Sequence, residues 1–267
     1  MSSDIWFLET ASRRTLNPRV ACSIESASMH NPDFTVHLLA TGNITHNAYY
    51  NVVSSLNNFK SERLDVNQEL AATPLTSLTK SKAFKTGPYT VEHLRDFLRS
   101  VVMWKRGGVY LDTDTIILKS PKGIRNSVVF EKDELDLANG IQFFYARHPA
   151  TRALIEKCAR VYEPQNWTSC GPALFTELLQ DCVFSHRLRF LKPETFLAVP
   201  WPKWKALFKP NETASVLKKR ENSYGVHLWN KLSKNEKVSP GSGCAVDILF
   251  RQHCPRVYKL ASSEKYF

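Results

Sequence analysis

The sequence predicts an α/β fold in which a mostly parallel sheet is flanked by helices and followed by a less regular C-terminal third. The first observation is a strand, helix, strand order near the start: residues 4–8 and 34–40 are apolar runs, and residues 18–30 carry apolar and small side chains at helical spacing. Such a βαβ unit is typical of parallel sheets. The second observation is an amphipathic helix at 92–105 that passes through two glycines into another apolar run.

The remaining elements follow from the same patterns. Short helices are predicted at 47–56 and 67–70, and strands at 109–111 and 116–118. The second half alternates less cleanly, and its predicted strands and helices lie at 128–130, 142–145, 150–162, 171–181, 224–229 and 246–250. The segment from 193 to 208 is rich in proline and aromatic residues, so we expect irregular structure there.

Composition limits the function classes. A chain of 267 residues with 43% hydrophobic residues can bury one sizeable core, so we expect a single domain. The formal charge of +11 favours anionic partners such as phosphates, nucleotides or acidic lipids, although a basic surface can also serve solubility alone. Nucleic acid is the weakest candidate partner, because the chain has no recognition motif and no basic run longer than Lys218-Lys219-Arg220.

Targeting signals are weak in this chain. No window holds the roughly 18 apolar residues of a membrane helix, and the first residues lack the features of a signal peptide. The chain is therefore either soluble or the folded part of a longer protein. None of its six cysteines forms a C-x-x-C pair, which argues against a zinc ribbon. Three N-x-T sequons, at Asn43, Asn166 and Asn211, lean toward a secretory lumen.

The stretch GGVYLDTDTIIL at 107–118 places Asp112 and Asp114 between two apolar runs. Residues i and i+2 of an extended chain point the same way, so the two carboxylates repel each other unless a cation lies between them. A hard divalent ion such as Mn²⁺ or Mg²⁺ takes oxygen ligands and leaves positions for phosphate oxygens. A solvated acidic turn is the alternative, but the apolar flanks favour a metal site.

The stretch LRDFLRSVVMWKRGGVYLDTDTIILK at 94–119 resembles the α-1,4-glycosyltransferases of the lactosylceramide 4-α-galactosyltransferase type. Further segments match that family in the same order: FLET at 7–10, CSIESA at 22–27, Asn139-Gly140, Gly171-Pro172, PWPKWKALF at 200–208 and YGVHLWNKLS at 224–233. The resemblance implies a GT-A fold and one catalytic domain over 1–267. Within it, about 4–119 would bind the nucleotide sugar and about 120–260 the acceptor.

The resemblance also implies the activity: retaining transfer of a hexose, galactose or N-acetylhexosamine, from a UDP-sugar to a glycolipid such as lactosylceramide in α-1,4 linkage. Mn²⁺ is the implied cofactor, and glycosphingolipid biosynthesis is the implied process. Carried over by position, the site residues fall into three groups. The catalytic residues are Asp112, Asp114 and Asn139; the metal ligands are Asp112, Asp114 and His227; the donor-binding residues are Phe7, Glu9, Thr10, Asp96, Arg99, Asp112, Thr113 and Lys231.

Several of these residues have a simpler interpretation. Without the family, His227 reads as a half-buried histidine on a strand, and Lys231 as part of a solvated loop. Asp96 and Arg99 are neighbours on the helix and could form only a surface ion pair. The resemblance suggests Trp201 and Trp204 for the acceptor, whereas tryptophans at this density are often core residues.

One departure from the family bears on activity. Relatives carry a His-Gln-like pair before the Gly-Pro step, and this sequence has Ser169-Cys170 instead. A catalytically inactive relative that binds a nucleotide sugar or glycolipid is therefore the alternative function. The residues also show no clear nucleophile, so retention through a covalent intermediate and retention by front-face attack both stay open.

The family further implies a Golgi lumenal domain behind an N-terminal membrane anchor, and this chain lacks the anchor. Membrane association would then come through the substrate or through a missing N-terminal segment. In that oxidising compartment disulfides would form, and the resemblance suggests a Cys182–Cys254 bridge.

Overall fold

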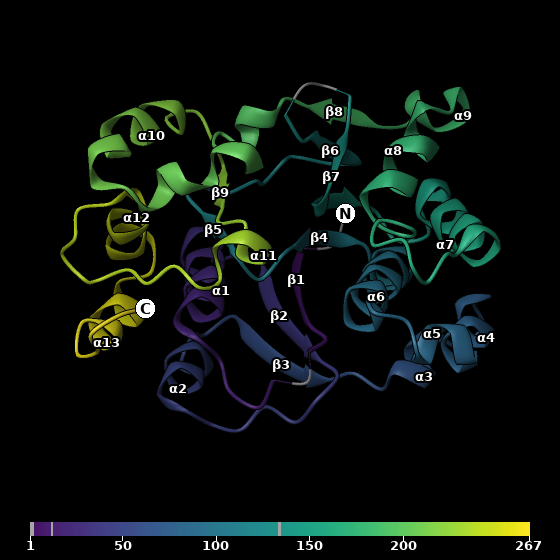
Figure 1. Cartoon of the computed structure of the whole chain (residues 1–267), viewed down its shortest axis with the longest axis horizontal. Coiled ribbons are helices and arrows are strands. Elements are labelled where there is room, and N and C mark those ends of the chain that lie inside the picture. The colour runs from purple at the N-terminus through teal and green to yellow at the C-terminus, as the bar shows by residue number, and fades with distance from the viewer. Residues whose placement is uncertain (1–2, 12, 133–134) are drawn as a thin grey trace.

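The computed structural model describes residues 3–11, 13–132 and 135–267. Its centre is a seven-stranded sheet in the order β3-β2-β1-β4-β7-β6-β8, and a two-stranded ribbon pairs β5 with β9 (Figure 1). The strands are β1 Asp4–Glu9, β2 Thr35–Ala40, β3 Phe59–Arg63, β4 Gly108–Leu111, β5 Thr115–Ile117, β6 Ser127–Phe130, β7 Leu137–Phe144, β8 Arg189–Leu191 and β9 Gly225–His227. Four of the six neighbouring pairs in the large sheet are parallel, which confirms the predicted mostly parallel α/β fold.

Helices cover both faces of the sheet (Figure 1). The helices are α1 Pro18–His30, α2 Ala48–Ser54, α3 Val66–Leu70, α4 Leu75–Lys80, α5 Lys82–Lys85, α6 Thr90–Arg106, α7 Pro149–Val161, α8 Pro172–Gln180, α9 Cys182–Ser185, α10 Thr213–Lys219, α11 Asn230–Ser233, α12 Ala245–His253 and α13 Pro255–Ala261. The proline-rich segment forms the 3-10 helices η1 Pro193–Thr195, η2 Trp201–Phe208 and η3 Pro210–Glu212. Within the described residues no helix is both long enough and apolar enough to cross a membrane.

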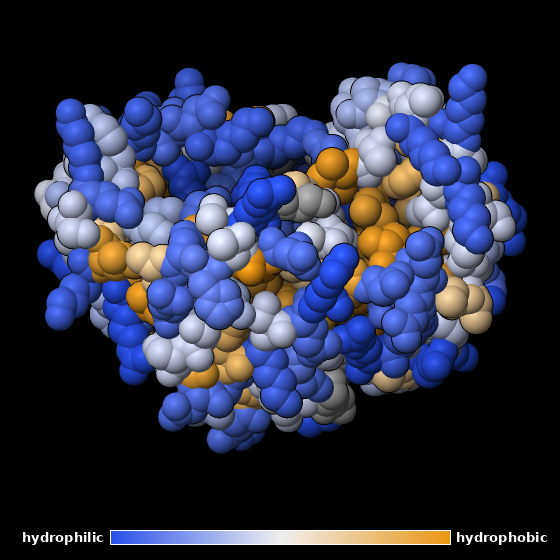
Figure 2. Space-filling view, turned by 90° about the horizontal axis from the view of Figure 1, so that it is seen from below, coloured by the Kyte–Doolittle hydropathy of each residue, from blue (hydrophilic) through white to orange (hydrophobic). Residues whose placement is uncertain are grey.

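Two hydrophobic clusters lie on opposite faces of the sheet. Alternate residues of one strand belong to different clusters: Ile5 and Phe7 pack in the cluster that includes α1, and Trp6 and Leu8 in the one that includes α6. Strands buried on both faces explain the uninterrupted apolar runs in the sequence. Figure 2 shows one face of the molecular surface, seen from below the view of Figure 1. Hydrophilic side chains dominate this face, and hydrophobic ones gather in its middle.

Local sequence explains where the main elements begin and end. The side chain of Asn17 accepts a hydrogen bond from the Val20 amide (2.9 Å), and Pro18 occupies the first turn, so α1 starts where predicted. Two strands, β3 and β8, were missed by the prediction. Residues 59–63 read FKSER and are mostly exposed at the sheet edge, so no apolar alternation marks them.

The disulfides differ from the one that was suggested. Cys22 is bonded to Cys254, and Cys158 to Cys170. The predicted Cys182–Cys254 bridge is therefore wrong, because the Cys254 thiol is taken by Cys22, which lies on the facing surface of α1. The side chain of Cys182 lies outside the described part of the chain.

Gly107 joins α6 to β4 with φ +64°, and a Cβ there would lie 2.3 Å from the backbone nitrogen of Ala146. We expect Gly107→Ala to lower the free energy of unfolding by about 3 kcal/mol, since both backbone strain and a backbone clash arise. Gly123 is the matched control, because its φ is +97° and a Cβ added there would meet nothing within 4 Å. Gly123→Ala should lower the free energy of unfolding by only about 1 kcal/mol in urea denaturation. Equal losses in the two variants would show that the clash with Ala146 does not add to the destabilisation.

Candidate active site

The site forms where β1 and β4 end at the same edge of the sheet. These strands pair in parallel, so the end of β1 at Glu9-Thr10 and the residues after β4, Asp112-Thr113-Asp114, lie at the same edge. The Asp112 amide donates to the Gly140 carbonyl of β7 (2.8 Å), which fixes the chain at the first aspartate. Open α/β sheets bind ligands at this edge.

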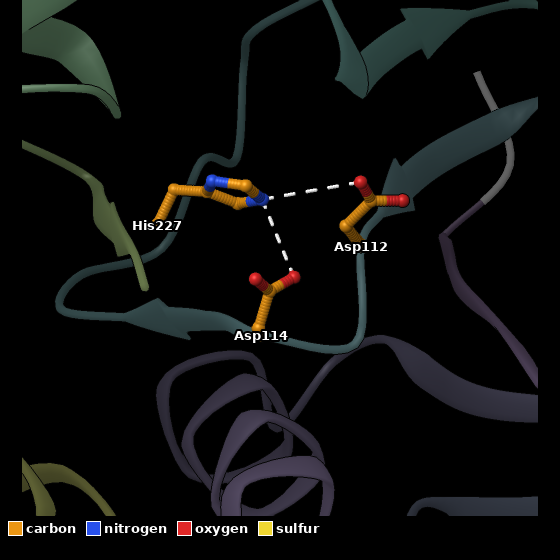
Figure 3. A group of neighbouring side chains, drawn as sticks. All are labelled: Asp112, Asp114 and His227. Carbon is orange, nitrogen blue, oxygen red and sulfur yellow. Dashed lines mark ion pairs between the residues drawn. The ribbon is translucent and has the colours of Figure 1, made fainter. Parts of the chain in front are cut away.

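Asp112 and Asp114, from the turn between β4 and β5, converge with His227 of β9 (Figure 3). The His227 Nε2 atom lies 3.3 Å from Asp114 Oδ1 and 3.9 Å from Asp112 Oδ2. One candidate ligand atom from each residue lies within 4.8 Å of the others. The β5–β9 ribbon places the histidine, because Thr115, next to Asp114, pairs with His227 across it.

Charge in this group depends on its burial and on its partners. Burial lowers the pKa of His227, but Asp114 and Asp112 together raise it to about 10. Burial acts to raise the pKa of Asp112, yet Arg99 and His227 bring it well below its usual value, and the pKa of Asp114 is also lowered, chiefly by His227. In the absence of an ion, a proton on the imidazole therefore balances the carboxylates, and a divalent ion could replace it.

A buried polar network surrounds the first aspartate. Arg99 donates from Nη2 to Asp112 Oδ1 (3.2 Å), and its Nη1 lies 3.2 Å from Asp96 Oδ1. The Tyr110 hydroxyl donates to the same Asp112 oxygen (2.7 Å). Arg99 is only 4% exposed, so the pair with Asp96 is not the surface ion pair that was the alternative interpretation. A buried, fixed arginine beside a candidate metal-binding carboxylate is suited to anion recognition.

The network continues to β7 through Asn139. Asn139 donates from Nδ2 to Asp96 Oδ1 (3.2 Å), and Gln142 donates from Nε2 to Asn139 Oδ1 (2.6 Å). Gln142 thereby fixes which way the Asn139 amide faces. The predicted residues Asp96, Arg99, Asp112 and Asn139 thus form one connected group.

The far side of Asp114 is held by the segment after His227. The Asn230 amide donates to Asp114 Oδ2 (2.6 Å). Trp229 adopts a left-handed conformation with φ 57°, which turns that amide toward the carboxylate, and its ring meets the His227 ring edge-on at 4.4 Å. Arg19, buried on α1, donates to Asn230 Oδ1 (3.0 Å) and to the Ser233 carbonyl (2.9 Å), so it anchors this segment.

Other predicted residues lie apart from this group. Phe7 is fully buried in the core cluster under α1. Glu9 accepts from the Ala11 amide (2.8 Å), and Thr10 donates to the Val91 carbonyl (3.4 Å) at the start of α6. The Lys231 ammonium lies 3.4 Å from Glu92 and 4.1 Å from the centre of the Trp167 ring.

The two acceptor candidates differ in exposure. Trp201 is 41% exposed, whereas Trp204 packs edge-on against Phe208 at 5.8 Å. Trp229 donates from Nε1 to the Val199 carbonyl (2.8 Å), which ties the segment that carries these tryptophans to the strand of His227. Nothing in these contacts tests their role, so acceptor binding stays a prediction.

Ser169 and Cys170, the departure from the family pattern, have structural roles. Cys170 is bonded to Cys158 of α7, and the Ser169 hydroxyl accepts from the Glu163 amide (2.7 Å). Gly171, which follows, leaves room for Asp96, since a Cβ there would lie 2.6 Å from Asp96 Oδ2. Ser169 and Cys170 therefore supply a hydrogen bond and a disulfide just before the glycine that faces Asp96.

Sequence reasoning missed four contributors: Tyr110, Gln142, Arg95 and Arg19. The period of two in β4 places Tyr110 on the same side as Asp112, so this signal was present in the sequence. Burial lowers the pKa of Arg95, but Asp112, Tyr110 and Asp96 together raise it above its usual value, which places a second arginine in the field of the site. Arg19 is far away along the chain, and only the fold reveals it.

Gly140 of β7 offers a test of the Asp112 position, because a Cβ there would lie 2.6 Å from Asp112 Oδ2 and 3.0 Å from its Cγ. We expect Gly140→Ala to weaken Mn²⁺-dependent UDP binding by about 10- to 100-fold, the usual effect of disturbing a metal ligand's surroundings. Calorimetric titration would measure it. Gly87→Ala is the control, since its closest contact is 3.3 Å and it lies outside the site; unchanged binding in Gly140→Ala would contradict the geometry.

An α/β sheet that brings an Asp-x-Asp pair, a histidine and a buried arginine to its strand ends defines a glycosyltransferase of the DXD class. Residues 17–133 match the family described as "Glycosyltransferase sugar-binding region containing DXD motif", and residues 143–261 match "Alpha 1,4-glycosyltransferase conserved region". The two matches follow each other along the chain and together support the α-1,4-glycosyltransferase resemblance that the sequence motifs suggested.

Individual relatives agree with this assignment. The lactosylceramide 4-alpha-galactosyltransferase of Rattus norvegicus is 28% identical over 274 residues, covering 96% of this chain and 75% of the relative. The alpha-1,4-N-acetylglucosaminyltransferase of Homo sapiens is 29% identical over 276 residues, covering 96% and 79%. Among solved structures, PaToxG glycosyltransferase superposes with a TM-score of 0.52 at 16% identity, covering 84% of each chain. The fold is therefore the GT-A glycosyltransferase fold.

Proposed function

We propose that this α-1,4-glycosyltransferase moves galactose or an N-acetylhexosamine from a UDP-sugar to a glycolipid acceptor, such as lactosylceramide, with retention at the transferred carbon. The observation that carries the proposal is the convergence of Asp112, Asp114 and His227 beside Arg99. The named activities of the relatives, one a galactosyl and one an N-acetylglucosaminyl transferase, support a hexose donor and an α-1,4 product. Glycosphingolipid biosynthesis is the process that this reaction would serve.

Mn²⁺ is the proposed cofactor, and the three side chains fit it. The Nε2 atom of His227, which lies toward both carboxylates, is buried without a hydrogen-bond partner in the described part of the chain, as expected of a nitrogen that coordinates an ion. Two carboxylates and an imidazole suit a divalent ion of this type. When bound, the ion supplies Lewis-acid stabilisation of the charge on the leaving diphosphate.

The chain's own residues would orient the donor. Arg99 is held between Asp96 and Asp112, so its guanidinium is fixed before any substrate arrives, which lowers the entropic cost of binding. Asp96 and Asn139 lie next to the Arg99 guanidinium, and their polar side chains can bind sugar hydroxyls. Lys231 would reach the diphosphate only after leaving Glu92, because the two side chains are paired at 3.4 Å.

The acceptor side and the compartment belong to the same proposal. Exposed Trp201, near the site segment, suits stacking on a sugar ring. Two disulfides favour an oxidising compartment, which agrees with the Golgi lumen. The three sequon asparagines are exposed and accessible to N-glycosylation. Association with the membrane would come through the glycolipid substrate.

A donor and acceptor panel tests the proposal. UDP-galactose, UDP-N-acetylgalactosamine and UDP-N-acetylglucosamine would each be offered with Mn²⁺ and lactosylceramide or related glycolipids. We expect UDP release with one donor, and a product whose new anomeric proton shows the small coupling of an α linkage by NMR. A β-linked product, or no transfer with any donor while UDP binds tightly in the presence of Mn²⁺, would contradict the proposed reaction.

A further inference from the structure

A second concave site lies at the opposite end of the β5–β9 ribbon from the metal ligands. At one end of the ribbon Thr115 pairs with His227, and at the other Ile117 pairs with Gly225, after which the Leu118 amide donates to the Tyr224 carbonyl (2.9 Å). A cavity of about 320 Å³ opens there. Its lining residues are Leu118, Lys119, Leu217, Lys218, Arg220, Glu221, Ser223 and His253.

The lining is strongly basic. Lys119, Lys218 and Arg220 carry positive charge, and Glu221 is the acidic residue among the lining side chains. Lys119 is held in place, because its ammonium donates to the Asn222 carbonyl (2.9 Å) and lies 4.6 Å from the centre of the Tyr224 ring. The cavity therefore presents more cationic than anionic groups.

Two of the lining side chains, Arg220 and His253, form a hydrogen-bonded chain that continues to His30 behind the cavity. Arg220 Nη1 lies 3.5 Å from His253 Nε2, and His253 Nδ1 lies 2.9 Å from His30 Nε2 on α1. Because arginine can only donate, His253 accepts at Nε2 and donates from Nδ1, and His30 accepts at Nε2. Both imidazoles are therefore neutral in this arrangement, and no carboxylate takes part in it.

Arg220 is only partly satisfied by the protein. Its Nη2 donates to Gln252 Oε1 (3.1 Å), whereas its Nε is buried and has no partner among the described residues. A buried donor without a partner is costly, and it is expected where a ligand completes the hydrogen bonding. A guanidinium with free donors is the usual partner of phosphate oxygens.

We infer that this cavity is an anion site that binds a phosphate monoester, held by Arg220 and the flanking lysines, with His253 taking up a proton from solvent when the dianion binds. The same chemistry is offered by a soluble phosphate ester and by a phosphorylated lipid headgroup. The site is separate from the metal ligands, and the inference does not depend on the proposed donor or acceptor.

Electrostatics in the free protein agree with this arrangement. Burial, followed by the electrostatic effects of the neighbouring His30 and Arg220, lowers the pKa of His253 to about 4, and burial also lowers the pKa of His30. A bound dianion would raise the pKa of His253, so protonation favours binding and binding favours protonation. The groups that face His253 are His30 of α1 and Arg220, which directly follows α10, with Lys119, Lys218 and Glu221 around the opening. Affinity should therefore rise as pH falls from neutral toward 5.

Sulfate is the first probe, because it stays dianionic throughout this range and any pH dependence then comes from the protein. Calorimetric titration should show tighter sulfate binding at pH 5.5 than at pH 7.5, with proton uptake in buffers of different ionisation enthalpy. Arg220→Gln should weaken binding at least about tenfold, the scale of a lost charged hydrogen bond. Lys259→Gln, which removes one charge from exposed α13, should leave binding unchanged.

Two further binding experiments distinguish a soluble phosphate ester from a phosphorylated lipid headgroup as the ligand. Glycerol 3-phosphate tests a soluble ester, and vesicles of phosphatidylcholine with or without phosphatidylinositol 4-phosphate test a headgroup. Lys218→Gln provides a second variant at an exposed position in case Arg220→Gln unfolds. Equal sulfate affinity in the Arg220, Lys218 and Lys259 variants, or no binding of any probe, would overturn the inference, whereas UDP binding should stay intact in all three.

Discussion

Asp114→Asn should abolish Mn²⁺-dependent UDP binding while leaving the fold in place. The asparagine can still accept the hydrogen bond that the Asn230 amide gives to Asp114 Oδ2 (2.6 Å), so the local backbone keeps its support. It removes a charged metal ligand, however, and the loss should exceed the roughly 10- to 100-fold effect of disturbing a ligand's outer partners. Titration of UDP with and without Mn²⁺, together with thermal unfolding, measures both parts.

Asp33→Asn is the matched control, since Asp33 is 69% exposed and pairs with Lys122 at the surface. It should bind UDP and Mn²⁺ like the unchanged protein. Undiminished metal-dependent binding in Asp114→Asn would refute the assignment of the metal ligands. Loss of folding in that variant would instead show that the charge of Asp114, paired with His227, stabilises the fold.

The Cys22–Cys254 disulfide should be the larger contributor to stability of the two bridges. It closes a loop with a sequence separation of 232 residues, against 12 for Cys158–Cys170. Loop-closure entropy then predicts a loss of about 5 kcal/mol on removing the long bridge and about 3 kcal/mol on removing the short one. The long bridge also joins α1 to α13, where Glu25 accepts hydrogen bonds from the Arg256 and Val257 amides (2.9 and 2.8 Å).

Paired alanine variants test this comparison by urea denaturation. Cys22→Ala with Cys254→Ala should unfold at lower denaturant than Cys158→Ala with Cys170→Ala. The reverse order would mean that native-state packing, rather than the entropy of the unfolded chain, sets the contribution of each bridge. A Cys22 variant that also loses UDP binding would show that the position of α1, and hence of Arg19, reaches the site.

The sequence predicted the parts of the fold that have a strong periodic signal. The βαβ unit at the start, the amphipathic α6 and the Asp-x-Asp step were predictable because apolar spacing, helix caps and two carboxylates between apolar runs each have a direct physical meaning. The exposed edge strand β3 was not, since its five residues carry little apolar alternation and its pairing with β2 is set by the sheet.

Contacts between distant segments were the least predictable part of the site. The Asp112–Asp114–His227 group needed the family resemblance, because a histidine 113 positions after Asp114 carries no local signal of proximity. The disulfide partner of Cys254 was predicted wrongly for the same reason, since pairing depends on which helix surface faces it. Tyr110 could have been found, because it stands two residues before Asp112 on one strand.

The most direct test of the account is UDP release by the unchanged protein, followed with a UDP-sugar and a glycolipid acceptor in Mn²⁺ and again after chelation with EDTA. We predict turnover in Mn²⁺, loss of turnover in EDTA, and recovery when Mn²⁺ is restored. Turnover that persists in EDTA would contradict a metal held by Asp112, Asp114 and His227 as the centre of the reaction.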